Sequence, residues 1–411
     1  MLSIGIDTHQ KMHYVEIQNE EEKVKWRGQV TNDREGFDEL LSKLKTIEKS
    51  NNDRVIGIYI NPTGNYHIPV QYFLESNGYI VKYVDARVTD YSRKIDNLGK
   101  EKSDRVDASV LASTPWNSKK IANKITHRRD PLSGLTRLRE SVSENITRIT
   151  NIIESDLACI FPEYVEMFQG VSSATSVALL QNFTTPDKAV KSGVDRILNV
   201  MAKSSKNHYK KEDAQKFIDL ASKSIGVPDR DGIYAFRIKV DLERLVSEKK
   251  KLKEIENEIL KMTENNDDVK RIDGIIGIGP INAASIVSEI GDIEQFDSAL
   301  KLQSYGGRAP NMTGSGGKDH ATGLSKVRNP YLSNAIHQCS ISLVNHRNDE
   351  FLEIFDREVR KGKKKTQAYI IVGRRLLYHV YSIMKNQKPY RKRVSNQREG
   401  TLPLQVKNHV L

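Results

Sequence analysis

The chain has 411 residues, more than one compact hydrophobic core usually supports, so we expect two or three domains. Hydrophobic residues make up 37% and charged residues 29%, and the net charge of +12 indicates a polyanionic partner such as nucleic acid. The two cysteines, Cys159 and Cys339, lack the spacing of a zinc motif and suit a reducing compartment. No apolar run reaches the roughly 18 residues of a membrane-spanning helix. The first residues also lack the basic start of a signal peptide, so we expect a cytoplasmic protein.

The first third of the chain predicts an α/β domain with a mixed sheet in its centre and helices outside. Strand-like segments come first, and helical and apolar segments then alternate, as in a sheet covered by helices. The almost continuous apolar run before Asn61 is typical of a strand buried on both faces. The expected elements are strands at Leu2–Asp7, Tyr14–Gln18 and Val24–Val30, a helix at Asn32–Lys45 with Asn32 as N-cap, a strand at Arg54–Ile60, a helix carrying Val70, Phe73 and Leu74, a strand at Tyr79–Val84, and a helix carrying Lys102–Ala108.

The middle of the chain predicts two long helices, Leu135–Ile160 and Phe236–Met262, separated by a less regular insertion at about 165–228. In the second helix, apolar residues recur every seven positions, which is the pattern of a coiled coil. These residues are Ile238, Leu245, Leu252 and Ile259. The partner can be the first long helix or another protomer, and ordinary packing in a helical core is the alternative. Asn265–Asp268 is predicted to be a hinge.

The last third begins with a glycine turn between two predicted helices, within Ile275–Ile290. Gly277 and Gly279 suit a tight hairpin whose backbone N–H groups can hold a phosphate, although a plain turn has the same pattern. Gly306–Gly323 is predicted to be a glycine-rich loop, and Asn334–Met384 to be helical and increasingly basic.

The C-terminal segment Arg357–Arg398 contains fourteen Lys and Arg residues but only one acidic residue, Glu358. Tyrosines are interleaved with these charges, which favours a nucleic-acid-binding surface over a merely solubilising tail. Binding through phosphates should weaken steeply as salt rises. The candidate contacts to nucleic acid are Gly277, Gly279, Lys318, Lys363, Lys364, Lys365, Arg374 and Arg375.

Three aspartates are candidate metal ligands. Asp7 ends the first predicted strand, where a carboxylate can hold a cation over a sheet, although most strand-end aspartates are ordinary turn residues. Asp104 and Asp107 are three apart on a predicted helix, so they project from one face. Like charges so placed repel unless a cation lies between them, and carboxylate oxygens suit Mg²⁺. A solvated helix face paired with Lys102 and Arg105 is the alternative.

Ser315 is the candidate nucleophile. It lies between Gly314 and Gly316, and a serine in a glycine-rich loop near basic residues can approach a phosphodiester closely. A base, a metal ion or cationic surroundings must activate its hydroxyl. The Gly-Ser-Gly triplet is also typical of a flexible loop.

Taken together, these segments resemble the insertion-sequence 110 family of transposases, which includes the Piv- and MooV-type DNA invertases. The resemblance covers nearly the whole chain, and its motifs are individually loose but specific in their combined order. The residues that carry it are Asp7, Thr63-Gly64-Asn65-Tyr66, Lys102–Ala108, the glycine hairpin, Pro310 with the later Ser315-Gly316, and Gly362, Ala368 and Pro389-Tyr390.

The resemblance implies a RuvC-like (RNase H-like) α/β domain with an Asp-Glu-Asp-Asp metal site over residues 1–128. It also implies a helical coiled-coil region for assembly over 129–264. A mainly α transposase domain with a helix-hairpin-helix and the serine loop would cover 265–395, and a basic, disordered tail 396–411. The implied localisation is the cytoplasm and nucleoid of a prokaryote.

The chemistry implied by the family is DNA recombination guided by a bridge RNA. Asp7, Asp104 and Asp107 would bind Mg²⁺, and Ser315 would attack DNA to form a covalent phosphoserine link. Because Ser315 and the aspartates lie in different domains, a composite site in a homo-oligomer (a dimer or a tetramer) is implied.

Asn61 departs from the family pattern, because it stands where the family places glutamate, just before Thr63-Gly64. Asparagine offers one neutral carbonyl oxygen, so it should weaken metal binding. The site can tolerate Asn61, or Asp85 can substitute for the missing carboxylate, or the chain is a degenerate copy that binds nucleic acid without cutting it. Two alternatives to a recombinase therefore remain: a catalytically silent nucleic-acid-binding derivative, and a metal nuclease in which Ser315 is only a loop residue.

Overall fold

The structure, a computed structural model, describes residues 1–51, 53–62, 65–84, 103–116, 125–126, 131–168, 170–315, 318–324 and 328–391. The chain forms two compact units. The first unit contains Met1–Arg129 and Gly291–Asp297, and the second contains Asp130–Ile290 and Ser298–Leu411. The predicted boundaries within the second unit stay predictions, and the predicted tail at 396–411 lies outside the described residues.

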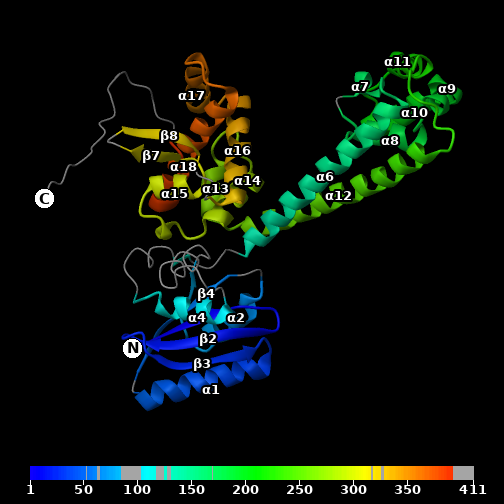
Figure 1. The fold of residues 1–411 in the computed structure, drawn as a ribbon. Helices are drawn as coiled ribbons and strands as arrows, with labels where there is room; N and C mark the ends of the chain where they lie inside the picture. The colour runs from blue at the N-terminus through cyan, green and yellow to red at the C-terminus, as the bar shows by residue number, and fades with distance from the viewer. Residues whose placement is uncertain are drawn as a thin grey trace. The chain divides into compact units, whose positions relative to one another are not determined.

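A mixed sheet forms the centre of the first unit, as predicted (Figure 1). Its strand order is β3-β2-β1-β4-β5-β6. Strand β1 runs antiparallel to β2 and parallel to β4, and β4 runs parallel to β5. The strands are β1 (Leu2–Asp7), β2 (Met12–Asn19), β3 (Val24–Thr31), β4 (Val55–Asn61), β5 (Val81–Val84) and β6 (Ile125–Thr126). This arrangement is compatible with a RuvC-like domain.

Helices cover both faces of this sheet (Figure 1). Helices α1 (Arg34–Asn51) and α2 (His67–Ser76) pack on the face that carries Ile4 and Ile6 of β1. Helix α4 (Asp104–Ser113) packs on the other face, so close to Gly5 that a Cβ there would lie 2.1 Å from the carbonyl oxygen of Ala108. Because successive residues of a strand alternate between faces, Asp7 lies on the same face as Gly5, beside α4.

The start of α1 corrects one sequence prediction. The helix begins at Arg34, and Asp33 caps it by accepting a hydrogen bond from the N–H of Gly36 at 2.9 Å. Asn32, the predicted N-cap, instead donates through its side chain to the carbonyl of Gln10 at 3.1 Å. Both side chains can cap a helix, and tertiary contact with Gln10 decides between them.

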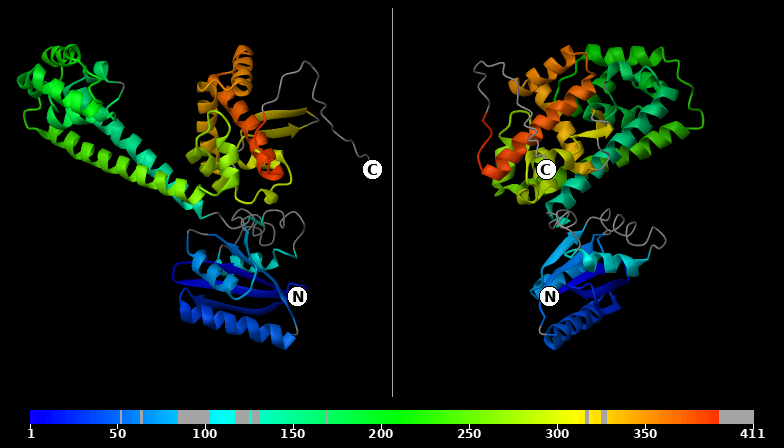
Figure 2. Two further views of the ribbon diagram at one scale, coloured as in Figure 1. Left: turned by 180° about the vertical axis from the view of Figure 1, so that it is seen from behind. Right: turned by 60° about the vertical axis from the view of Figure 1, so that its left-hand side comes forward.

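Two long helices dominate the second unit: α6 (Leu132–Ile160) and α12 (Ile233–Thr263). The two helices pack side by side within the same chain, as both figures show (Figures 1 and 2). Arg139 of α6 forms an ion pair with Glu256 of α12 at 3.0 Å. Three of the four heptad residues of α12, Ile238, Leu245 and Ile259, are buried. A coiled coil, whether within one chain or between protomers, stays a prediction.

The segment predicted to be a less regular insertion is helical. Its core is aromatic, with Phe161, Tyr164 and Phe217 all fully buried against one another. Its helices are α7 (Tyr164–Met167), α8 (Ala174–Asn182), α9 (Pro186–Ser192), α10 (Val194–Ser205) and α11 (Lys211–Ser222). These short helices have weak periodicity, and packing against the ends of α6 and α12 stabilises them.

Most of the remaining elements form a mainly helical body, from which a β-hairpin extends to one side (Figure 1). They are α13 (Asp267–Asp273), α14 (Pro280–Ile290), the short 3-10 helix η1 (Ile293–Gln295, in the first unit), α15 (Ala299–Tyr305), β7 (Pro310–Ser315), β8 (Lys318–Leu324), α16 (Pro330–Asn345), α17 (Asp349–Arg360) and α18 (Lys365–Asn386). The predicted loop over 306–323 is therefore wrong in part, because β7 and β8 pair in antiparallel register. Helix α13 also ends before Ile275, where a helix was predicted, and the predicted hinge is the capped start of α13, where Asn266 accepts from the N–H of Val269.

One buried carboxylate, Glu289, and one partly buried carboxylate, Glu350, hold this body together. Glu289 of α14 accepts two hydrogen bonds of 2.6 Å from Arg137 of α6 and one of 2.7 Å from Asn329, the N-cap of α16. Glu350 of α17 accepts hydrogen bonds from Arg375, His379 and Tyr390. In the part of the chain that the structure describes, no helix is both long and apolar enough to cross a membrane.

Candidate metal site and serine hairpin

Asp7 and Asn61 lie next to each other at the carboxyl ends of two parallel strands. They are register partners in the pairing of β1 with β4, so their side chains project from the same face of the sheet, toward α4. Both residues are buried, with 5% and 9% of their surface exposed. The hydroxyl of Thr8 donates to the carbonyl of Asn61 at 3.2 Å and ties the two strand ends together.

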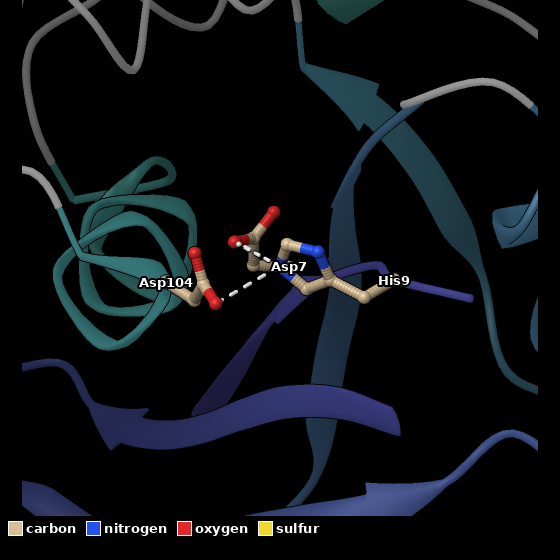
Figure 3. A group of neighbouring side chains, drawn as sticks. All are labelled: Asp7, His9 and Asp104. Atoms are coloured by element: carbon tan, nitrogen blue, oxygen red, sulfur yellow. Dashed lines mark hydrogen bonds and ion pairs between the residues drawn. The ribbon is translucent and has the colours of Figure 1, made fainter. Parts of the chain in front are cut away.

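Asp104 meets Asp7 from the helix side, with His9 between them (Figure 3). Nε2 of His9 lies 3.1 Å from Oδ2 of Asp7 and 3.3 Å from Oδ2 of Asp104. One donor atom from each of the three residues lies within 4.8 Å of the others. The aspartate that ends the first strand and the aspartate that begins the helix therefore lie close together.

Helix α4 places its acidic residues at its own N-terminus. The hydroxyl of Ser103 caps the helix by accepting from the N–H of Val106, and Asp104 and Asp107 follow in the first turn. The positive end of the helix dipole favours carboxylates there. Asp107 is half-buried and is close enough to Asp7 to raise the pKa of that group.

The electrostatics of Asp7 fit a cation. Burial raises the pKa of Asp7 to about 6, His9 opposes this shift, and the charges of Asp107 and Asp104 add to it. A carboxylate that is held among other carboxylates away from water is stabilised by a positive charge placed between them. In this structure the His9 ring occupies that position. Carboxylate oxygens suit Mg²⁺, and an imidazole nitrogen beside them also suits Mn²⁺ or other transition-metal ions.

His9 was not predicted as a site residue. It lies in the turn after β1, outside any strand or helix, so no periodicity marks it. The available signal was its position two residues after the strand-end Asp7, because a turn returns its side chains to the strand end. Asp85, the predicted substitute for a fourth carboxylate, lies outside the described residues.

Ser315 is the last residue of β7, and it pairs with Lys318, the first residue of β8. The serine and one predicted phosphate contact therefore lie together at the end of a hairpin, rather than in an unstructured loop. Both belong to the second unit, whereas Asp7 and Asp104 belong to the first.

The other predicted nucleic-acid contacts differ in whether their side chains already interact with other residues of the protein. Lys364 and Lys365 are exposed at the start of α18. Lys363 is paired with Glu358 at 2.5 Å and Arg375 with Glu350 at 2.7 Å, so these two charges are partly compensated within the protein. Nε of Arg374 donates to the backbone carbonyl of Arg308 at 2.9 Å.

The predicted glycine turn lies between α13 and α14. Gly277 has a φ of +99°, which favours glycine, and a Cβ there would lie 3.0 Å from the backbone of Leu343. Gly279 immediately precedes α14. A helix-hairpin-helix that binds phosphate stays a prediction.

Comparison with known proteins gives two matches to transposase family models. The model of the DEDD transposases of IS110, described as "Transposase", matches residues 4–162. The model described as "Transposase IS116/IS110/IS902 family" matches residues 269–355. The first match contains Asp7, Asn61, Asp104 and Asp107, and the second contains Ser315.

Relatives align with different parts of the chain. The chain is 21% identical over 391 residues to the "Insertion element IS116 uncharacterized 44.8 kDa protein" of Streptomyces clavuligerus, covering 94% of this chain and 95% of the relative. It is 31% identical over 91 residues to the transposase for insertion sequence element IS1111A of Coxiella burnetii, covering 22% of this chain and only 25% of that relative. It is 32% identical over 123 residues to the pilin gene-inverting protein of Moraxella bovis, covering 29% of this chain and 38% of the relative. With transposase models matched in both units, the chain belongs to the insertion-sequence 110 family of transposases.

Proposed function

We propose that this transposase cleaves and exchanges DNA strands with Ser315 as nucleophile and with a divalent cation, Mg²⁺ in the first instance, held by its RuvC-like unit. Asp7, Asp104 and Asp107 would hold the cation, with His9 and the amide oxygen of Asn61 as further donors. The observation that carries this proposal is the convergence of Asp7 and Asp104 within 4.8 Å on the α4 face of the sheet.

The reaction would proceed by two transfers of one phosphoryl group. In the first, the Ser315 oxygen attacks the phosphorus, an ester bond to serine forms, and the bond to one deoxyribose oxygen breaks. The serine proton leaves to a base, and the deoxyribose oxygen gains a proton. In the second, the hydroxyl of another DNA strand loses its proton to a base and attacks the same phosphorus. The bond to the Ser315 oxygen then breaks, and that oxygen takes up a proton. A bound cation supplies charge stabilisation to the phosphoryl oxygens.

The assembly would bring the serine of one unit to the carboxylates of another, either within one chain or between protomers of a dimer or tetramer. A bridge RNA would select the donor and target DNA, as the resemblance to the family implies. Basic residues of α18 and the loop before it, such as Lys364 and Lys365, would contact phosphates.

Trapping a covalent protein–DNA adduct tests this proposal. The purified protein is incubated with its element-end DNA, guide RNA and Mg²⁺, and then denatured. We expect an adduct with the unaltered protein and none with Ser315→Ala, whereas Ser304→Ala, an exposed serine on α15, is the matched control and should retain it. Cleavage without an adduct would contradict the serine mechanism and favour a metal nuclease. Loss of the adduct in Asp7→Asn and Asp104→Asn would support the carboxylate site.

A further inference from the structure

Arg308 is a buried arginine at the base of the serine hairpin. It lies between α15 and β7, and 4% of its surface is exposed. Nη2 donates to the backbone carbonyl of Ser333 at 2.7 Å, and the backbone N–H donates to the carbonyl of Gln303 at 2.7 Å. Nε is buried without a hydrogen-bond partner.

No carboxylate lies within ion-pair distance of Arg308 among the described residues. This contrasts with Arg137, whose guanidinium is fully paired with Glu289. The charges that surround Arg308 are positive instead. The stem of Arg328 lies against Gly307, where a Cβ would meet Cδ of Arg328 at 2.2 Å, and Nε of Arg374 donates to the Arg308 carbonyl. Burial and, to a smaller extent, the charge of Arg328 lower the pKa of Arg308 to about 10.

The fold makes room for this guanidinium. Gly373 of α18 has no side chain where it faces Arg308, and a Cβ there would lie 3.1 Å from Nε of Arg308 and 2.9 Å from both Ile336 and Ser340. Burying an arginine without a carboxylate costs stability, because the desolvated charge is not compensated. A site that keeps such a charge is suited to an anion that arrives with a ligand.

We propose that Arg308, with Arg328 and Arg374, binds a backbone phosphate of the DNA strand that the hairpin presents to Ser315. This inference rests on the proposed function, because only that function brings DNA to the hairpin. Six residues lie between Arg308 and Ser315, so the two are at most about 23 Å apart along the chain. The phosphate bound at Arg308 therefore lies up to several nucleotides from the attacked phosphate along the DNA backbone, and the site acts in positioning.

DNA binding in the Ser315→Ala background tests the site separately from cleavage. The dissociation constant of a short fluorescent duplex is measured from about 50 to 200 mM KCl for that protein and with Arg308→Met added. We expect weakening on the order of tenfold to a hundredfold and a slope of log K against log salt that is shallower by about one. Arg196→Met, which removes an exposed guanidinium from α10, is the matched control and should change neither quantity.

The unfolding temperature without DNA separates a binding role from a structural one. If the buried charge is kept for a ligand, Arg308→Met should unfold at the same or a higher temperature than the parent. An unchanged salt slope in this folded variant would overturn the proposal, and so would weakening of RNA binding with DNA binding unaffected. If Arg308→Met does not fold, the same salt slope is measured for Arg328→Met, which changes an exposed position. A shallower slope in that variant supports the proposal, and an unchanged slope contradicts it. Absence of a covalent adduct with the unaltered protein would refute the serine chemistry and leave this binding result standing.

Discussion

Substituting Asn61 by glutamate would restore the carboxylate that the family places beside the Asp7 strand. The register of β1 and β4 puts the new side chain on the next strand, about 4.8 Å from Asp7 across the sheet. Two unit charges about 4 Å apart repel by about 4 kcal/mol at an effective dielectric constant of 20. The destabilisation cannot exceed the free energy of protonating Asp7, however, because a neutral Asp7 would no longer repel the new carboxylate.

This upper limit on the destabilisation follows from the pKa of Asp7, which burial raises to about 6. Neutralising that group at pH 7 costs about 1.4 kcal/mol. Without metal, Asn61→Glu should therefore lower the free energy of unfolding by about 1 to 1.4 kcal/mol. With a divalent cation at a hundred times its dissociation constant, binding contributes about 2.7 kcal/mol. The variant should therefore gain more from Mg²⁺ than the unaltered protein does.

Tryptophan fluorescence during urea unfolding can measure this gain, since both tryptophans, Trp26 and Trp116, belong to the first unit. Unfolding midpoints are compared with and without MgCl₂, and with MnCl₂ to test the His9 donor. Ser42→Glu adds the same charge at an exposed position of α1, on the opposite face of the sheet, and should not change the response to metal. Equal shifts by Mg²⁺ in Asn61→Glu and the unaltered protein would refute a cation shared by residues 7 and 61.

Three further predictions concern residues that stabilise the fold around the proposed sites. Arg137→Met should lower the free energy of unfolding by about 3 to 5 kcal/mol, because the charge of Glu289 is left buried without a cation. Chemical denaturation measures this loss. The double variant with Glu289→Leu should recover stability. Burial raises the pKa of Glu350, but hydrogen bonds from His379, Tyr390 and Arg375 outweigh burial and lower that pKa to about 2. The ionised Glu350 therefore stabilises the fold fully above pH 4.5, and this stabilisation is lost as the pH falls toward 2. Glu350→Gln should thus lower the unfolding temperature at pH 7 and have little effect near pH 2. Gly5→Ala should push α4 from the sheet, since its Cβ would lie 2.1 Å from the Ala108 carbonyl, and weaken Mg²⁺ binding measured by calorimetry.

Much of the first unit could be predicted because its signals are local. Apolar runs and β-branched residues mark β1, β2, β3 and β4, and a strand-end aspartate followed by a break marks the site. The faces of the sheet were harder to predict. Asp7 lies on the α4 face because β1 alternates and because only glycine at position 5 lets α4 approach so closely. That contact joins residues about a hundred positions apart in sequence, which no window of local periodicity reports.

The serine hairpin escaped prediction for a different reason. Asn311–Ser315 and Lys318–Ala321 consist mostly of polar residues and include Gly314, so strand propensity is low. Antiparallel pairing uses the backbone and forms regardless of side-chain preference once the two segments are brought together. His9 was missed on similar grounds, because its role depends on the return of a turn to the strand end.

Buried charge differs between the two proposed binding sites and the ion pairs that stabilise the rest of the fold. The buried Glu16 and Glu289 are paired with Arg27 and Arg137, and the partly buried Glu350 is paired with Arg375, so these carboxylates stabilise the fold without any ligand. Asp7 departs from this pattern because carboxylates crowd it, and Arg308 departs from it because cations crowd it. Each excess is a cost to folding that a ligand of opposite charge would remove: a cation at the sheet, and a phosphate at the hairpin. These two unbalanced charges, one negative and one positive, are the reason why we propose a metal site at Asp7 and a DNA phosphate site at Arg308.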